Sequence, residues 1–256
     1  MLNTIERRHE IVQLVGQTER VEVSELAEQF GVSTVTIRND LNALHEKGLL
    51  VRSHGGAVAS SRLTKELTIT EKHDHHHQVK VELAKLVAGL IGNDESIILD
   101  SGTTTEEVAK QLTEHQQLVV MTNGLNVAQA LVAADDVEVL MTGGSLRKKS
   151  LSFYGSHAED QLKQYHFDRL VLGVDGFSVD VGVTTHFEPE AALNREMCKV
   201  AKQVIVVTDS SKFDRKGVHR IIACEEIDVL VTDSGIPADV HQQLVAAGIE
   251  VHLITS

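Results

Sequence analysis

The stretch that decides the fold is residues 97–112, IILDSGTTTEEVAKQL. An apolar run ends at Asp100, a loop of small residues follows at 101–105, and a helical pattern comes next. This order of strand, loop and helix is typical of a parallel sheet covered by helices. It also suits an anion, because free backbone N–H groups and the helix dipole point at such a loop. The alternative is that Thr104 and Glu107 form a capping box that only starts the helix.

The same unit recurs from about residue 81 onward. Short apolar strands are predicted at 96–100, 118–122, 137–142, 169–175, 204–209, 229–233 and 250–254. Helical patterns fall between most of them, at 105–112, 125–134, 156–164, 189–202 and 237–247. The alternation predicts an α/β domain with a mostly parallel sheet and helices on both faces.

Residues 1–58 have a different pattern, which predicts a winged helix-turn-helix domain. Helical patterns at 4–16, 25–30 and 34–47 precede a hairpin pattern at 49–58. Ser24 and Ser33 are predicted N-caps, and Gly31 suits a left-handed helix end. With Ile37 pointing inward, the start of the third helix faces outward and can contact DNA. The DNA-binding candidates are Ser33, Thr34, Thr36, Arg38 and Asn39 on this helix, with Arg52 and His54 on the hairpin.

Composition is that of a soluble globular protein, with 42% hydrophobic and 24% charged residues and no apolar run of about 18 residues. The net charge of −13 argues against a nucleic-acid partner, because phosphate contacts need Lys and Arg. Residues 1–60, however, carry 6 Lys/Arg against 8 Asp/Glu, so most of the acidic excess lies beyond them. The charged N-terminus has no signal core and the two cysteines are isolated. We therefore expect a cytoplasmic protein without a membrane partner or a disulfide framework.

Residues 59–74 are polar and are predicted to link the first domain to an effector-binding and oligomerisation domain at 75–256. The run HDHHH, residues 73–77, lies at this junction. Histidines at this density can bind zinc or nickel, so a metal-responsive regulator is one alternative function. A solvated, His-rich linker is the plainer interpretation, and no metal ligand is assigned.

Several motifs together resemble the DeoR-type bacterial transcriptional repressors over essentially the whole chain. They are VSELAEQFGVSTVTIRNDLNALHEKGLLVRSHGGAV, ILDSGTTT, MTNGLNVAQAL, LMTGGSLRKKSLSFYG, FDRLVLGVDGF and VIVVTDSSKF. Their wording is most similar to the subgroup that represses N-acetylgalactosamine and galactosamine catabolism. The resemblance implies an operator-binding first domain and an oligomeric, sugar-phosphate-sensing second domain similar to ribose-5-phosphate isomerase. No cofactor is implied.

The resemblance also implies an effector pocket lined by the loops that follow several strands. By motif position its residues are Asp100, Ser101, Gly102, Thr103, Thr104, Asn123, Gly124, Gly143, Gly144, Asp175 and Lys212. Asp175 would accept hydrogen bonds from sugar hydroxyls. A second carboxylate is expected from Glu188, or from Glu190.

The similarity to an isomerase raises the alternative of an enzyme. An aldose–ketose isomerase needs a carboxylate base and a group that stabilises the enediolate. The isomerases carry a Lys-Gly-Gly-Gly loop shortly after the aspartate, whereas this chain has no lysine between Gly176 and Lys199. We therefore expect a sensor rather than an enzyme, and no catalytic residue is assigned.

Overall fold

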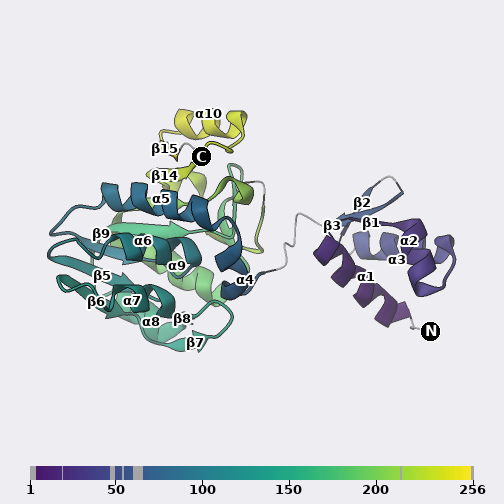
Figure 1. Cartoon of the computed structure of the whole chain (residues 1–256), viewed down its shortest axis with the longest axis horizontal. Helices are drawn as coiled ribbons and strands as arrows, with labels where there is room; N and C mark the ends of the chain where they lie inside the picture. Colours follow the sequence, from purple (N-terminus) through teal and green to yellow (C-terminus); the bar gives the residue numbers. More distant parts are fainter. Residues whose placement is uncertain are drawn as a thin grey trace. The chain divides into compact units, whose positions relative to one another are not determined.

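The computed structural model describes residues 4–18, 20–46, 50–53, 55–59, 66–213 and 215–254. The chain forms two compact units, and the boundary between them falls after Glu66 (Figure 1). No described helix is long and apolar enough to cross a membrane.

The first unit is the winged helix-turn-helix that the sequence predicts. Its elements are α1 (Thr4–Thr18), β1 (Arg20–Glu22), α2 (Val23–Phe30), α3 (Thr34–Glu46), β2 (Leu50–Ser53) and β3 (Gly56–Ala59). The strands form an antiparallel sheet of order β1-β3-β2. Ile37, Leu41 and Leu44, spaced at i, i+4 and i+7, are buried together with Ile11 and Leu26. This spacing places them on one face of α3, so the opposite face is turned to solvent.

The helix ends confirm two of the three local predictions. The Ser33 hydroxyl accepts a hydrogen bond from the Thr36 backbone N–H at 3.1 Å, and Gly31 has φ 64°. Ser24, however, does not cap α2, because the helix starts at Val23 and the N-cap is Glu22, without a side-chain hydrogen bond. Val23 is buried and donates its N–H to the Gly55 carbonyl at 2.9 Å. Tertiary packing therefore sets this helix start.

The second unit contains the predicted parallel sheet. Its seven strands are β4 (Ser96–Leu99), β5 (Leu118–Thr122), β6 (Val137–Met141), β9 (Phe167–Gly173), β12 (Ala201–Val207), β14 (Val229–Asp233) and β15 (Glu250–Ile254). They lie in the order β15-β14-β12-β9-β4-β5-β6, and every pair is parallel. All seven correspond to strands predicted from the apolar runs.

Helices cover both faces of this sheet, as expected for apolar strands (Figure 1). One face packs α5 (His77–Leu90), α6 (Thr103–Gln111) and α7 (Leu125–Leu131), and the other packs α8 (Ser156–Leu162), α9 (Glu188–Val200) and α10 (Ala238–Ala246). Within β4, Ile97 and Leu99 face the first group and Ile98 the second. Each fully buried aliphatic side chain contributes about 1.5–3 kcal/mol by leaving water.

Some elements were not expected from the sequence. They are β1, α4 (Ile69–Asp74), α5, the hairpin β7 (Ser145–Arg147) and β8 (Ser152–Tyr154), a small antiparallel sheet of β10 (Gly176–Ser178), β11 (Gly182–Thr185) and β13 (His219–Ile222), and the 3₁₀ turns η1 (Ser210–Lys212) and η2 (Cys224–Glu226). Helix α4 lies inside the stretch predicted to be a linker. Its start has a capping box, in which Thr68 and Glu71 bond each other's backbone N–H, and Ile69 is buried. The signal Thr-x-x-Glu is visible in the sequence, so this helix could have been found.

Candidate functional site

The outward face of α3 carries the residues predicted to contact DNA. Ser33, Thr34, Arg38 and Asn39 are exposed, while Thr36 is half-buried with its hydroxyl 2.9 Å from that of Ser33. The side chains of Arg38 and Asn39 are therefore accessible from solvent. The hydroxyls of Ser33 and Thr36 are partly used in the helix cap.

A buried carboxylate fixes the helix that carries this face. Asp40 of α3 accepts hydrogen bonds at 2.7 Å from Nε of Arg7 and from Nε of Arg8, both on α1. Asp40 is 2% exposed, so the pairing is shielded from solvent and sets α3 against α1. The sequence analysis did not identify this trio.

The hairpin candidates are described in part. Arg52 is half-buried and donates from Nη1 to the Gly56 carbonyl at 2.8 Å, which braces the wing turn. His54 lies outside the described residues.

In the second unit, β4 delivers the loop Asp100–Gly102 to the first turn of α6, as the sequence predicts. Gly102 is the N-cap of α6, and no side chain caps the helix. The alternative capping box of Thr104 and Glu107 is therefore wrong: Thr104 lies inside the helix, and Glu107 pairs with Lys110 at 2.8 Å. An N-terminus without a side-chain cap leaves backbone donors for an anion.

Residues from neighbouring loops hold this anion loop in place. Asn123 is fully buried, accepts a hydrogen bond from the Ser101 N–H at 3.0 Å, and donates to the Phe153 carbonyl. A Cβ on Gly124 would lie 3.0 Å from the Ser101 Cα, so only glycine fits there without a shift. Asn126 of α7, which the sequence analysis missed, donates to the Gly102 carbonyl at 3.0 Å.

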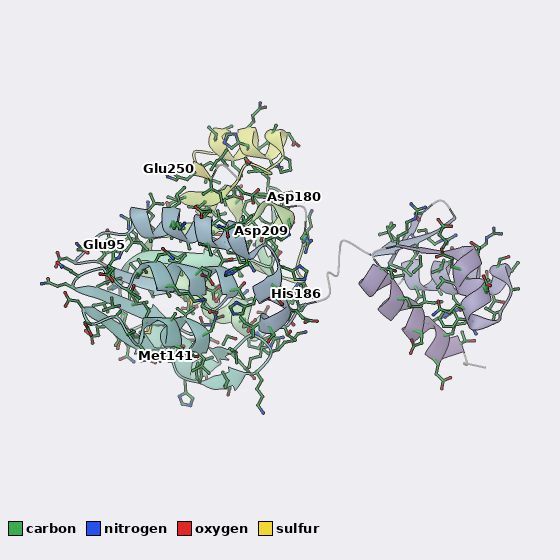
Figure 2. All side chains as sticks on the ribbon, in the orientation of Figure 1. Glu95, Met141, Asp180, His186, Asp209 and Glu250 are labelled. Carbon is green, nitrogen blue, oxygen red and sulfur yellow. The ribbon has the colours of Figure 1, made fainter. Side chains whose placement is uncertain are left out.

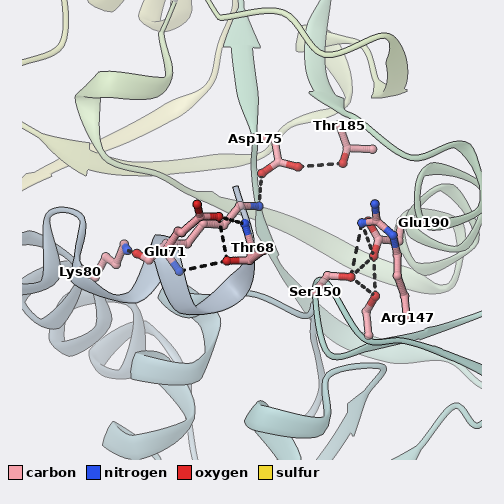
Figure 3. Close-up of polar contacts among 10 residues, drawn as sticks. Thr68, Glu71, Lys80, Arg147, Ser150, Asp175, Thr185 and Glu190 are labelled. Carbon is pink, nitrogen blue, oxygen red and sulfur yellow. Dashed lines mark hydrogen bonds and ion pairs between the residues drawn. The ribbon is translucent and has the colours of Figure 1, made fainter. Parts of the chain in front are cut away.

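Asp175 follows β9 at the same edge of the sheet and lies between a cation and a hydroxyl (Figure 3). Its Oδ1 is 2.5 Å from Nζ of Lys72 on α4, and its Oδ2 accepts from the Thr185 hydroxyl at 2.9 Å. Burial alone would raise the pKa of Asp175, but the charge and hydrogen bond of Lys72 lower it to about 2. Asp175 is therefore ionised, as a hydroxyl-binding carboxylate should be.

Asp100 has the opposite electrostatic state. Burial raises its pKa well above the usual value, and the charges of Glu190 and Asp175 raise it further. The side chain is 5% exposed. Two carboxyl groups with pKa values pushed apart at one site are a mark of a functional centre.

Cations lie on the α4 side of this cluster. Lys80 of α5 is buried and donates to the Lys72 carbonyl, and desolvation lowers the pKa of Lys80 to about 8. The charge of Lys212 on η1 lowers the pKa values of both Lys80 and Asp175, so Lys212 belongs to the same group. Asp209, labelled in Figure 2, caps η1 by accepting from the Ser211 N–H.

The structure distinguishes the two glutamates offered as the second carboxylate. Glu190 is buried and accepts from the hydroxyls of Ser150 and Ser152 and from Arg147 at 3.3 Å (Figure 3). Its charge also acts on Asp100. Glu188 is exposed and pairs with Arg195 at 2.5 Å and with His219 at 2.8 Å.

The guanidinium of Arg147 stacks 4.3 Å from the ring centroid of Phe187, which contacts Tyr154 edge-on. Gly143 and Gly144 lie before the hairpin β7–β8 with φ of 63° and 102°. A Cβ on Gly144 would lie 2.5 Å from the Tyr154 carbonyl oxygen. The absence of a side chain therefore allows the backbone at Gly144 to approach the backbone at Tyr154 closely. The resemblance implies that both glycines line the effector pocket, and this stays a prediction.

Together these groups offer backbone donors, lysines, the ionised carboxylate of Asp175, further carboxyl groups and hydroxyls within one edge of the sheet. That set suits a phosphorylated polyol, since cations and N–H groups hold phosphate and carboxylates accept from hydroxyls. The residues of this set come from α4, from the loops after β4, β5 and β9, and from α9.

Comparison with known proteins finds two family models that match the chain. Residues 7–62 match a DeoR-like helix-turn-helix domain, and residues 75–234 match a DeoR C-terminal sensor domain. The chain is 49% identical over 253 residues to an aga operon transcriptional repressor of Escherichia coli O157:H7, covering 98% of this chain and 94% of that protein. It is 34% identical over 251 residues to the glycerol-3-phosphate regulon repressor of Escherichia coli K12, covering 97% and 98%.

Comparison with solved structures gives weaker similarity. A sor operon regulator from Shigella flexneri has 11% identity and a TM-score of 0.45, covering 80% of this chain and 97% of that one. Ribose 5-phosphate isomerase A from Neisseria gonorrhoeae has 12% identity and a TM-score of 0.40, covering 53% of each chain.

Proposed function

The chain belongs to the DeoR family of DNA-binding transcriptional regulators, and we propose that it represses a galactosamine-type catabolic operon until a phosphorylated amino sugar binds. Membership confirms the resemblance stated from the sequence. The relative named for the aga operon supports the choice of pathway.

One observation carries the effector part of the proposal: an anion loop without a side-chain cap lies at the same sheet edge as the ion pair of Lys72 and Asp175. The phosphate would bind the N–H groups of the loop at 101–104, with a lysine nearby. Asp175 and Asp100 would accept hydrogen bonds from the sugar. Both ends of a sugar phosphate are then recognised at once.

Helix α4 offers a route from this site to the first unit. The second unit begins directly after Glu66, and α4 begins at Ile69, three residues after Glu66. Helix α4 also carries Lys72. A ligand that bonds Asp175, or that brings a phosphate near Lys72, would compete with the ion pair between Lys72 and Asp175. This ion pair joins α4 to the loop after β9. Release of operator DNA needs only a few kcal/mol of such coupling.

On the DNA side, Arg38 and Asn39 are the side chains that would contact base edges, with arginine suited to guanine and asparagine to adenine. The first unit is nearly neutral, so a single copy would hold DNA weakly. We therefore include homo-oligomerisation in the proposal, because two linked copies raise the effective affinity. Sedimentation of the free protein tests this part, and a monomer at micromolar concentration would contradict it.

The direct test of the effector is calorimetric titration of the full chain with galactosamine 6-phosphate, galactosamine and inorganic phosphate. The sugar phosphate should bind at least about tenfold tighter than either fragment, because it engages both ends of the site. Asp175→Asn should remove most of this gain. Asp160→Asn, an exposed aspartate on α8, is the matched control. Equal binding of phosphate and sugar phosphate, unchanged in Asp175→Asn, would refute the proposed site.

A Lys72→Met variant tests the route through α4. It should still bind operator DNA, but the sugar phosphate should release that DNA less completely than it does from wild type. Unaltered release would mean that α4 does not carry the signal.

A further inference from the structure

Three metal-ligating side chains, His73, Glu106 and Glu107, lie together where α4 packs on α6, and His77 of α5 lies beside them. Nε2 of His73 lies 3.0 Å from Oε2 of Glu106, and Nδ1 of His77 lies 3.9 Å from Oε1 of Glu107. One donor atom from each of His73, Glu106 and Glu107 lies within 4.8 Å of the others. Two donors on one tetrahedral zinc ion are about 3.3 Å apart, so small side-chain movements would suffice.

Burial and charge favour a cation at this place. The side chains of Glu106 and Glu107 are only 11% and 5% exposed, and Lys110 of the same helix pairs with both, at 3.0 and 2.8 Å. Two carboxylates against one ammonium leave a net negative charge beside two imidazoles. Imidazole nitrogen and carboxylate oxygen together suit zinc and similar divalent ions.

We propose that His73, His77, Glu106 and Glu107 bind a divalent transition metal of the zinc type, with Lys110 displaced toward solvent. Lys110 is 42% exposed at its side chain and has room to move. Among the described residues, His73 belongs to the group of three donors and His77 lies 3.9 Å from Glu107, whereas His75 and His76 are exposed and belong to neither arrangement. The site thus selects particular histidines from the run at 73–77.

The metal site connects to the effector site at two points. His73 follows Lys72, which pairs with Asp175. On the other side, Asn126 donates to Glu106 at 2.7 Å and to the Gly102 carbonyl at 3.0 Å. A bound ion would therefore tie α4 to the anion loop and bias the sugar-phosphate response. This last step rests on the proposed function, whereas metal binding itself does not.

The test uses the tag-free, full-length protein titrated with Zn²⁺ in chelator-free buffer, and with Co²⁺ as an optical probe. One ion per chain should bind, and Co²⁺ should give the intense visible bands of a four-coordinate site. His73→Ala and Glu107→Gln should each weaken binding by at least about tenfold, since even outer-shell changes at metal sites cost that much. His75→Ala, from the same run, should bind like wild type.

Two outcomes would overturn the proposal. In one, Zn²⁺ affinity is unchanged in both His73→Ala and Glu107→Gln. In the other, affinity falls in His75→Ala as much as in His73→Ala, which would indicate loose binding by the whole histidine run. Glu107→Gln preserves the shape of the side chain. Its melting temperature, compared with that of the wild type, shows whether a loss of Zn²⁺ affinity is due to misfolding. Sugar-phosphate binding measured without metal reports separately on the proposed function.

Discussion

The α3 face and the polar cluster at the carboxyl edge of the parallel sheet (Lys72, Lys80, Asp100, Asp175 and Glu190) use polar residues in opposite ways. On α3 the candidate side chains lie in solvent, and the charged groups beneath them, Asp40 with Arg7 and Arg8, are satisfied internally. In the second unit Asp100, Asn123 and Glu190 are themselves buried, Asp175 is partly buried, and Asp100 keeps a raised pKa. A surface that reads a large polyanion can stay solvated, whereas a site for a small ligand must keep desolvated charges ready to bind it.

This difference predicts where a substitution will damage function and where it will change stability. Changes on the α3 face should affect DNA binding and leave the fold nearly unaltered. Changes in the buried cluster should alter ligand binding and stability together. Four variants, in order of decreasing effect, test the contrast.

The largest effect is expected from Gly102→Asp at the anion loop. Its carboxylate would lie where the phosphate binds, and opposed like charges cost several kcal/mol, so sugar-phosphate affinity should fall by about a hundredfold or more. The backbone of Gly102 is extended, and a Cβ there meets only the Thr105 hydroxyl at 3.3 Å. Gly102→Ala is the control, and calorimetry should give it a sugar-phosphate affinity close to that of the wild type. Equal loss in both variants would indicate a steric rather than an electrostatic effect.

Next, Arg38→Ala should weaken operator binding by about 1–3 kcal/mol, measured by fluorescence anisotropy at fixed salt. The cause is the loss of one base or phosphate contact. Sugar-phosphate binding and the melting temperature should not change. Arg20→Ala removes an exposed arginine of the same unit, away from α3, and serves as the control. If the two variants behave alike, α3 is not the reading helix.

The third prediction concerns the stability of the buried cluster. The folded-state pKa of Asp100 lies above its ordinary value of 3.8, so the folded protein holds this proton more tightly than the unfolded chain. Between these two pKa values the stability contributed by Asp100 falls as pH rises. Asp100→Asn should therefore raise the free energy of unfolding at neutral pH by about 1–2 kcal/mol while weakening effector binding. Urea unfolding across pH measures this, and a loss of stability at pH 7 would contradict it.

The smallest effect should come from Glu188→Gln. An exposed ion pair contributes about 0.2–1 kcal/mol, so unfolding should shift little and sugar-phosphate affinity should stay unchanged. Glu190→Gln is the matched partner and should lower sugar-phosphate affinity, because it breaks the buried contacts with Arg147 and Ser152. The reverse pattern would assign the second carboxylate to Glu188.

Periodicity alone predicted most of the fold. The apolar runs of the seven parallel strands and the i, i+4, i+7 spacing of α3 each fix one face of an element, and burial follows. The three-residue strand β1 was missed because it is too short to show a pattern. Helix α4 was missed because its segment is polar and shows no apolar periodicity. The capping box at Thr68 and Glu71 was present in the sequence and could have indicated the helix start.

The polar cluster at the carboxyl edge of the sheet could be predicted only in part. The place of Asp100 and Asp175 at one edge of the sheet could be predicted, because parallel strands end there. The place of Lys72 and Asn126 could not, since it depends on how α4 and α7 pack, and that packing is long-range. Glu188 and Glu190 are two residues apart at the start of a helix, where a small rotation decides which one is buried.

The central claim is that a sugar phosphate bound in the second unit releases the first unit from DNA. The most direct measurement is the fluorescence anisotropy of labelled DNA from upstream of the protein's own gene, bound by the protein at fixed salt and titrated with amino-sugar and hexose phosphates. We predict tight binding that a galactosamine-type phosphate relieves and that unphosphorylated sugars leave intact. Tight binding that no sugar phosphate relieves, or no specific binding at all, would contradict the account.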